Sequence, residues 1–154
     1  AIEYYEDSLL PLARLYNLER ELDQALQEKI WLKSGGFLII QQTEAFVAID
    51  VNTGKHSSKK DAEENYKQIN REAALEIARQ LRLRNLSGMI LVDFINMKNT
   101  NDQSELLQYM GSLVRSDPMQ TVVVDVTALG IMEITRKKSA KTLAEQLLQL
   151  KKGE

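Results

Sequence analysis

A chain of 154 residues that is 44% hydrophobic and 27% charged is long enough for one globular domain with its own hydrophobic core. Its 20 Lys and Arg residues and 22 Asp and Glu residues give a net charge of −2, which excludes an overall positive field for nucleic acid or anionic lipid, so any polyanion must bind at a local site. The absence of cysteine excludes disulfides and thiolate zinc sites and fits the reducing cytoplasm, and no apolar run approaches the ~20 residues that span a bilayer.

The first predicted elements are one helix and three short strands. Residues 8–29 place leucines at spacings of three and four, with Asn17 as a candidate cap, which is the pattern of an amphipathic helix. After this helix the apolar period changes to two, and residues 30–54 read "IWLKSGGFLIIQQTEAFVAIDVNTG". This stretch predicts three strands, with turns at Ser34-Gly35-Gly36 and near Gln42-Thr43.

The second half of the chain alternates helices and strands. Residues 61–85 show a second helical stripe, and the run "GMILVDF", residues 88–94, is typical of a strand buried on both faces. The remaining predicted elements are a helix over 101–116, strands over 121–126 and 130–137, and a closing helix over 140–150. This order predicts an α/β domain with a mixed β-sheet packed with helices.

Two aspartates stand at the ends of two predicted strands. Side chains alternate along "EAFVAIDVN", so Asp50 and Asn52 share one face, and Asp93 follows the apolar run of the strand over 88–94. Carboxylates at the ends of buried strands are costly unless they are paired, hydrogen-bonded or neutralised by a cation. Mg²⁺ is typically held by one or two carboxylates, with waters and substrate phosphates in the other positions. Asp50 and Asp93 therefore predict a Mg²⁺ site, which Mn²⁺ could also occupy, and Asn52 could orient the Asp50 carboxylate.

The same residues have a structural interpretation. A single aspartate at a strand end is often a cap or the partner in a surface ion pair, and sequence spacing does not establish that the two strands are neighbours. The candidate cations for positioning a polyanion such as RNA are Lys55 and the short basic segment that contains Arg136, Lys137 and Lys138. Charges of this kind are also common on ordinary protein surfaces.

Three blocks of sequence carry a resemblance to a known family. They read "SGGFLIIQQTEAFVAIDVNTGK", "NREAALEIARQLRLRNLSGMILVDFINM" and "TALGIMEITRKK". Together, from about Leu9 to Arg136, they closely resemble the DNase I-like catalytic subdomain of the bacterial ribonuclease E/G family, in the order found in the family. The resemblance implies that residues 31–154 form this subdomain and that residues 1–30 are the helical tail of an RNase H-like domain.

The resemblance also implies an activity. Members of the family are endoribonucleases that cut single-stranded RNA and leave a 5′-phosphate and a 3′-hydroxyl. By this resemblance Asp50 and Asp93 would bind Mg²⁺, and Asn52 would assist Asp50. Full-length members also carry an S1-type RNA-binding domain, a sensor of the RNA 5′ end and a cysteine pair that links subunits through zinc. The chain is therefore expected to be part of a longer, homo-oligomeric enzyme and to cleave RNA weakly or undetectably by itself.

Two positions depart from the family pattern. Asn96 stands where members often have a second aspartate in "DFIDM", and Met119-Gln120 stands where some have a basic residue. Asn96 and the small net charge favour a second hypothesis, a non-catalytic RNA-binding or scaffolding module that retains the fold. A third hypothesis is an α/β domain whose aspartates are only structural.

Overall fold

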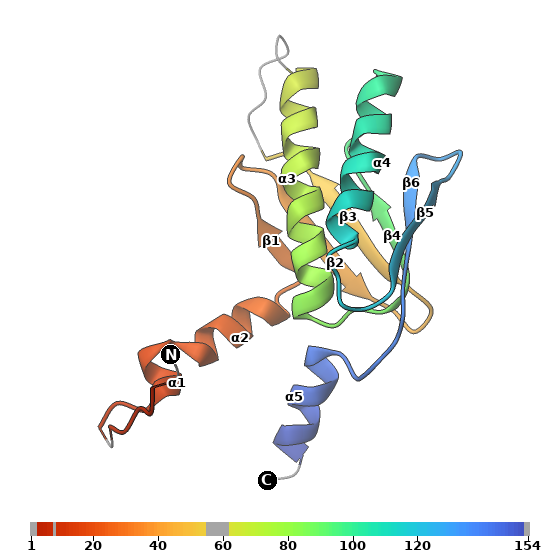
Figure 1. The fold of residues 1–154 in the computed structure, drawn as a ribbon. Helices are drawn as coiled ribbons and strands as arrows, with labels where there is room; N and C mark the ends of the chain where they lie inside the picture. The colour runs from red at the N-terminus through yellow and green to blue at the C-terminus, as the bar shows by residue number, and fades with distance from the viewer. Residues whose placement is uncertain (1–2, 8, 55–61, 153–154) are drawn as a thin grey trace.

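The computed structural model describes residues 3–7, 9–54 and 62–152 (Figure 1). The elements in these ranges are α1 (Leu12–Leu15), α2 (Leu18–Leu26), β1 (Lys29–Trp31), β2 (Phe37–Gln42), β3 (Val47–Asn52), α3 (Ala62–Leu83), β4 (Gly88–Asp93), α4 (Thr100–Val114), β5 (Thr121–Val126), β6 (Ile131–Arg136) and α5 (Leu143–Lys152). None of the helices in the described ranges has both the length and the apolar character needed to cross a membrane.

The six strands form one mixed sheet in the order β1-β2-β3-β4-β6-β5. Neighbouring strands are antiparallel except for β3 and β4, which are parallel and are connected through α3. Antiparallel strands can be joined by a tight turn, whereas parallel neighbours need a longer crossover such as a helix. The α/β fold with a mixed sheet, predicted from the sequence, is confirmed.

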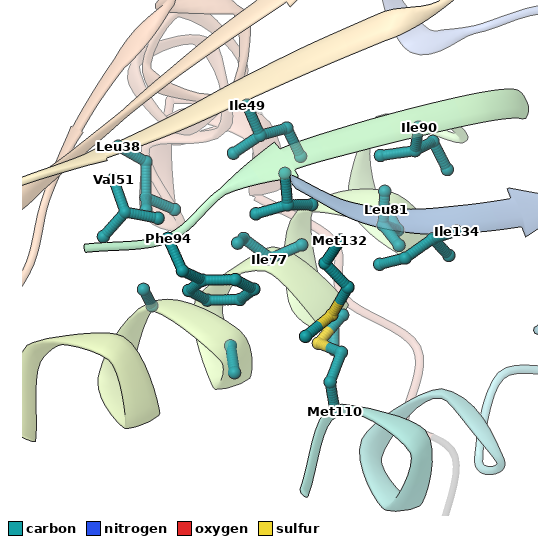
Figure 2. Close-up of a cluster of buried hydrophobic side chains, with 14 of the residues drawn as sticks. Leu38, Ile49, Val51, Ile77, Leu81, Ile90, Phe94, Met110, Met132 and Ile134 are labelled. Carbon is teal, nitrogen blue, oxygen red and sulfur yellow. The ribbon is translucent and has the colours of Figure 1, made fainter. Parts of the chain in front are cut away.

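The hydrophobic core lies between the sheet and helices α3 and α4 (Figures 1 and 2). Leucine and isoleucine side chains of α3 and a methionine of α4 pack against alternate residues of the central strands. At most 2% of the surface of each of these side chains is exposed: Ile49, Ile77, Leu81, Ile90, Met110 and Ile134. Burying a side chain of this size contributes about 1.5–3 kcal/mol relative to leaving it in water. The core therefore holds β3 and β4 firmly against α3.

The opposite face of the sheet is open. In β4, Ile90 and Val92 are 0% exposed, but Met89 is 45% exposed and Leu91 is only half-buried. The prediction that residues 88–94 form a strand buried on both faces was therefore wrong. The physical reason is that α3 and α4 both pack on the same face of the sheet, so every second residue of β4 points away from them (Figure 1).

The predicted helix over residues 8–29 is divided into two. Asn17 has a left-handed backbone conformation, with φ of +52°, and its side chain makes no capping hydrogen bond to the start of α2. The helical hydrogen-bond pattern breaks at this residue, so α1 and α2 run in different directions away from the sheet (Figure 1). Of the residues in these two helices only Ala25 is buried, so their leucines remain largely in solvent.

Candidate functional site

The parallel pair of β3 and β4 brings Asp50 and Asp93 together. The two residues are register partners at the carboxyl ends of the strands, and neighbouring strands lie about 4.8 Å apart. Residues adjacent to them, Ile49, Val51 and Val92, are buried against the helices. Because side chains alternate along a strand, both aspartates point to the open face, where both are exposed.

Asn52 lies beside Asp50 on the same face. Its side-chain Nδ2 donates a hydrogen bond to Oδ2 of Asp50, with 2.7 Å between the two atoms. This bond restricts the rotation of the Asp50 carboxylate and does not involve its other oxygen, Oδ1. The arrangement is the one that the sequence predicted for an orienting amide.

Close backbone packing supports the strand end that carries Asn52. A Cβ atom at Gly54 would overlap the carbonyl oxygen of Gly35, and one at Gly36 would lie 2.9 Å from the carbonyl oxygen of Asn52. The β1–β2 turn can therefore approach the end of β3 only because these positions lack side chains. This contact fixes the backbone near Asp50.

The segment after Asp93 is held by a buried amide. Asn70 of α3 is 0% exposed, its Nδ2 donates to the carbonyl oxygen of Ile95 over 2.8 Å, and its Oδ1 accepts from the N–H of Ile95 over 3.0 Å. The backbone N–H and carbonyl of Ile95, two residues after Asp93, are thus both hydrogen-bonded to α3. Asn70 was not among the residues predicted from the sequence, although an asparagine within the apolar stripe of a helix is a recognisable signal.

The two carboxylates form a small set of hard oxygen ligands. Among the residues that the structure describes, no cation forms an ion pair with either aspartate, and no group of three or more His, Cys, Asp or Glu side chains could hold a metal. Like charges at adjacent positions of a sheet destabilise it unless a cation is present. Two carboxylates fit Mg²⁺, which keeps several waters and shares its coordination with phosphate, better than they fit a metal with an all-protein ligand shell.

A cavity of about 380 Å³ opens next to Asp93. It lies between the segment that follows β4 and the β5–β6 turn, and it combines apolar walls with a few polar groups. The lining side chains include Phe94, Asn96, Met97, Gln103, Thr127 and Leu129. Asn96, the position that departs from the family pattern, is therefore part of the wall of this cavity.

Of the predicted basic residues, the three that the structure describes do not lie at the aspartates. Lys55 lies outside the described residues. Arg136 is 4% exposed, and its guanidinium donates to Asp117, Asn85 and the Leu86 carbonyl, so the structure does not present it to RNA.

Lys137 and Lys138 are exposed but lie at the other end of the sheet. They follow Arg136, which pairs with Gly88 at the start of β4, whereas Asp93 is five residues further along that strand, or roughly 17 Å. The basic segment is therefore well separated from the aspartate pair.

The aromatic residues of the open face were also not predicted as site residues from the sequence. Trp31 pairs with Phe37, and Phe37 pairs with Asn52, so all three project to the side of the sheet that carries the aspartates. The alternation within β1 and β2 was the available signal, because Ile30 and Leu38 are the apolar partners that face the core. The open face thus combines carboxylates, an amide and aromatic rings.

Comparison with known proteins gives consistent matches over most of the chain. The family model described as Ribonuclease E/G family matches residues 1–139. Ribonuclease G of Escherichia coli (strain K12) is 40% identical over 137 residues, which are 89% of this chain and 28% of that protein. Ribonuclease E of a Nostoc species is 38% identical over 144 residues, which are 94% of this chain and 21% of that protein. The chain therefore spans less than a third of the length of these relatives.

Proposed function

Because the chain belongs to the ribonuclease E/G family, we propose that it is a catalytic region of a Mg²⁺-dependent endoribonuclease that cleaves single-stranded RNA. The observation that carries the proposal is the in-register placement of Asp50 and Asp93 on the open face of the sheet. The names of the relatives, ribonuclease G and ribonuclease E, support the reaction class. The metal, the single-stranded substrate and the product ends are part of the proposal.

Asp50 and Asp93 are the residues that would hold the metal. A bound Mg²⁺ would supply positive charge to the scissile phosphate and make a water a stronger nucleophile. Asn52 keeps one oxygen of Asp50 in a hydrogen bond, so the carboxylate does not have to be reoriented when the substrate arrives. The open face gives an extended strand of RNA access to both carboxylates without first displacing a covering helix.

The proposed reaction is hydrolysis of a phosphodiester bond of RNA. Water attacks the phosphorus, the bond between phosphorus and the 3′-oxygen breaks, and that oxygen takes a proton. The downstream product then carries a 5′-phosphate and the upstream product a 3′-hydroxyl. Asp50 and Asp93 would contribute by holding a cation, whose positive charge would stabilise the phosphate, which is already anionic before the attack begins.

The first test is metal binding by the chain itself. Titration with Mg²⁺ or Mn²⁺, followed by NMR, is expected to perturb the amide signals around Asp50 and Asp93. The variants Asp50→Asn and Asp93→Asn should lose the perturbation, whereas Asp125→Asn, which changes an exposed aspartate of β5, should retain it. If neither metal perturbs these residues, the aspartates are structural and the proposal is wrong.

The second test is RNA cleavage. Labelled single-stranded RNA is incubated with the chain, with and without Mg²⁺, in long reactions, because the resemblance implies slow cutting by this part alone. Cutting should require Mg²⁺ and disappear in the Asp50→Asn, Asp93→Asn double variant. Equal cutting by the double variant would rule out the enzyme. RNA binding without cutting, together with metal binding, would favour the alternative of a non-catalytic RNA-binding or scaffolding module.

A further inference from the structure

An exposed tryptophan lies on the same face as the aspartate pair. Trp31 is 64% exposed, although a tryptophan side chain gains more than most from burial. It is connected to the candidate site by one row of cross-strand partners, Trp31 to Phe37 and Phe37 to Asn52. Two strand spacings separate Trp31 from Asn52, which is roughly 10 Å. The aromatic residue is therefore close to Asp50 without touching it.

A lysine completes the cluster. The Nζ atom of Lys29 lies 4.1 Å from the centroid of the Trp31 ring and 3.9 Å from that of Phe37. The two rings are 5.2 Å apart at an angle of 60°, an edge-to-face contact that fixes the plane of Trp31. Within the described residues Lys29 forms no ion pair, so its charge is available to an anion.

We propose that Lys29, Trp31 and Phe37 form a stacking subsite for a base of single-stranded RNA that extends to Asp50 and Asp93. Single-stranded RNA is held by aromatic rings on which its bases stack and by cations that contact its phosphates. Trp31 and Phe37 supply the rings, and Lys29 supplies the cation on its flexible stem. The inference rests on the proposed function, because it names a contact of the same RNA beside the same carboxylates.

The charge of Lys29 decides between RNA and an apolar protein partner. A protein surface that covered Trp31 and Phe37 would also cover the ammonium group that lies over their rings, and a buried charge without a partner is costly. A phosphate group removes that cost by pairing with the ammonium. Paired bases in a duplex have no free face to stack on a side chain, so the subsite should select single strands.

The single tryptophan of the chain gives a direct test. Oligoadenylate is titrated into the protein in EDTA, which prevents metal-dependent cutting, while tryptophan emission and the anisotropy of a labelled strand are followed. Saturable quenching of Trp31 by the single strand, and not by a duplex of the same length, is expected. Binding of the labelled strand with unchanged Trp31 emission would overturn the proposal, as would no binding at all. Emission that changes with protein concentration and not with RNA would also overturn it, because it would indicate a protein interface.

Variants separate stacking from general damage to the fold. Trp31→Ala should weaken binding of oligoadenylate about 5-fold to 100-fold, and Trp31→Phe should retain most of the affinity. The matched control is Tyr16→Ala, which removes an aromatic ring that is 65% exposed but lies between α1 and α2. Unchanged binding by Trp31→Ala would overturn the subsite.

The two proposals fail in different ways. If Trp31→Ala binds and cuts RNA as the unmodified chain does, while the double aspartate variant cuts nothing, the proposal of a stacking subsite is wrong and the proposal of a nuclease stands. If Trp31→Ala loses affinity for RNA but the double aspartate variant still cuts it, the proposal of a stacking subsite stands and the proposal of a metal-dependent nuclease is wrong.

Discussion

At the scale of single residues, the distinctive feature of the chain is a pair of adjacent negative charges. Asp50 and Asp93 are register partners in parallel strands, and the described part of the chain pairs no cation with them. Adjacent like charges cost free energy in the folded protein, and a bound cation of the proposed kind would remove that cost.

The effect of the Asp93→Asn substitution on the melting temperature should therefore depend on divalent metal, and should be stabilising without it and destabilising with it. In EDTA the variant removes the repulsion and should melt up to about 4 °C higher than the unmodified chain. With saturating Mg²⁺ the unmodified chain should gain stability by binding, while the variant gains little. Thermal melting in both conditions, with Asp125→Asn as the control, measures the effect. An Asp93→Asn variant that melts lower in EDTA, or that gains as much from Mg²⁺, would contradict the expectation.

Some residues of the candidate site could be predicted from the sequence and others could not. Asp50, Asn52 and Asp93 are recognisable because each breaks an apolar strand pattern at a strand end. The proximity of Asp50 to Asp93 could not be predicted from the sequence, because it depends on β3 and β4 being neighbours that are joined through α3. Arg136 could not be placed correctly either, because its burial depends on Asp117, which is 19 positions away in the sequence.

At the scale of elements, the Arg136–Asp117 ion pair links the end of α4 to the end of β6. The closest atoms, Nε and Oδ2, are 2.7 Å apart, and both side chains are 3% exposed. Burial opposes ionisation of Asp117, but the hydrogen bonds from Arg136, Thr121 and the Met119 N–H outweigh it, and the pKa of Asp117 is lowered from its ordinary 3.8. The ionised carboxylate therefore stabilises the folded chain.

This pair should make stability depend on pH in the acid range. A folded-state pKa below the unfolded value means that the stabilisation is complete above about pH 3.8 and is lost as the pH falls through the lower folded value. Asp117→Asn should therefore lower the free energy of unfolding at pH 7 by about 3–5 kcal/mol, because it leaves the buried guanidinium of Arg136 without an opposite charge. Urea unfolding across a pH series should show this difference shrinking below pH 3.8. A difference that is constant with pH would exclude the ion pair as its cause.

Element types were predictable where one face of a helix or strand has a clear pattern. Strands β2 and β3 and helices α3 and α4 follow their apolar periods, and the structure has them near the predicted bounds. The break at Asn17 was not predictable from periodicity, because the leucines continue their spacing across it. The one-sided burial of β4 was also hidden, since an apolar run does not reveal whether a second layer covers it.

At the scale of the whole molecule, the two faces of the sheet differ in burial and in the side chains that they carry. The side covered by α3 and α4 supplies the stability, and the open side carries the carboxylates, the amide and the aromatic cluster. With a net charge of −2, the chain has no overall positive field that would attract RNA at long range, so the proposed binding must depend on close contacts such as stacking and a local cation.

The leucines of α1 and α2 are a further group of exposed apolar side chains. Leu12 and Leu15 of α1 and Leu18, Leu22 and Leu26 of α2 are 38–47% exposed, and within α2 the leucines repeat every four residues. Exposed apolar surface of this kind is commonly an interface. We therefore expect the chain to self-associate through α1 and α2, with an average mass in light scattering that rises with concentration.

Replacing two neighbouring leucines of α2 should abolish this association. The Leu18→Glu, Leu22→Glu variant puts two charges one turn apart on the apolar stripe, so it should remain monomeric, whereas Leu75→Glu, at an exposed leucine of α3, should not change the mass. Because Trp31 lies on the open face of the sheet, the α2 variant should still show quenching by oligoadenylate. A mass that does not depend on concentration in the unmodified chain would contradict the interface, and loss of quenching in the α2 variant would show that the two surfaces are not independent.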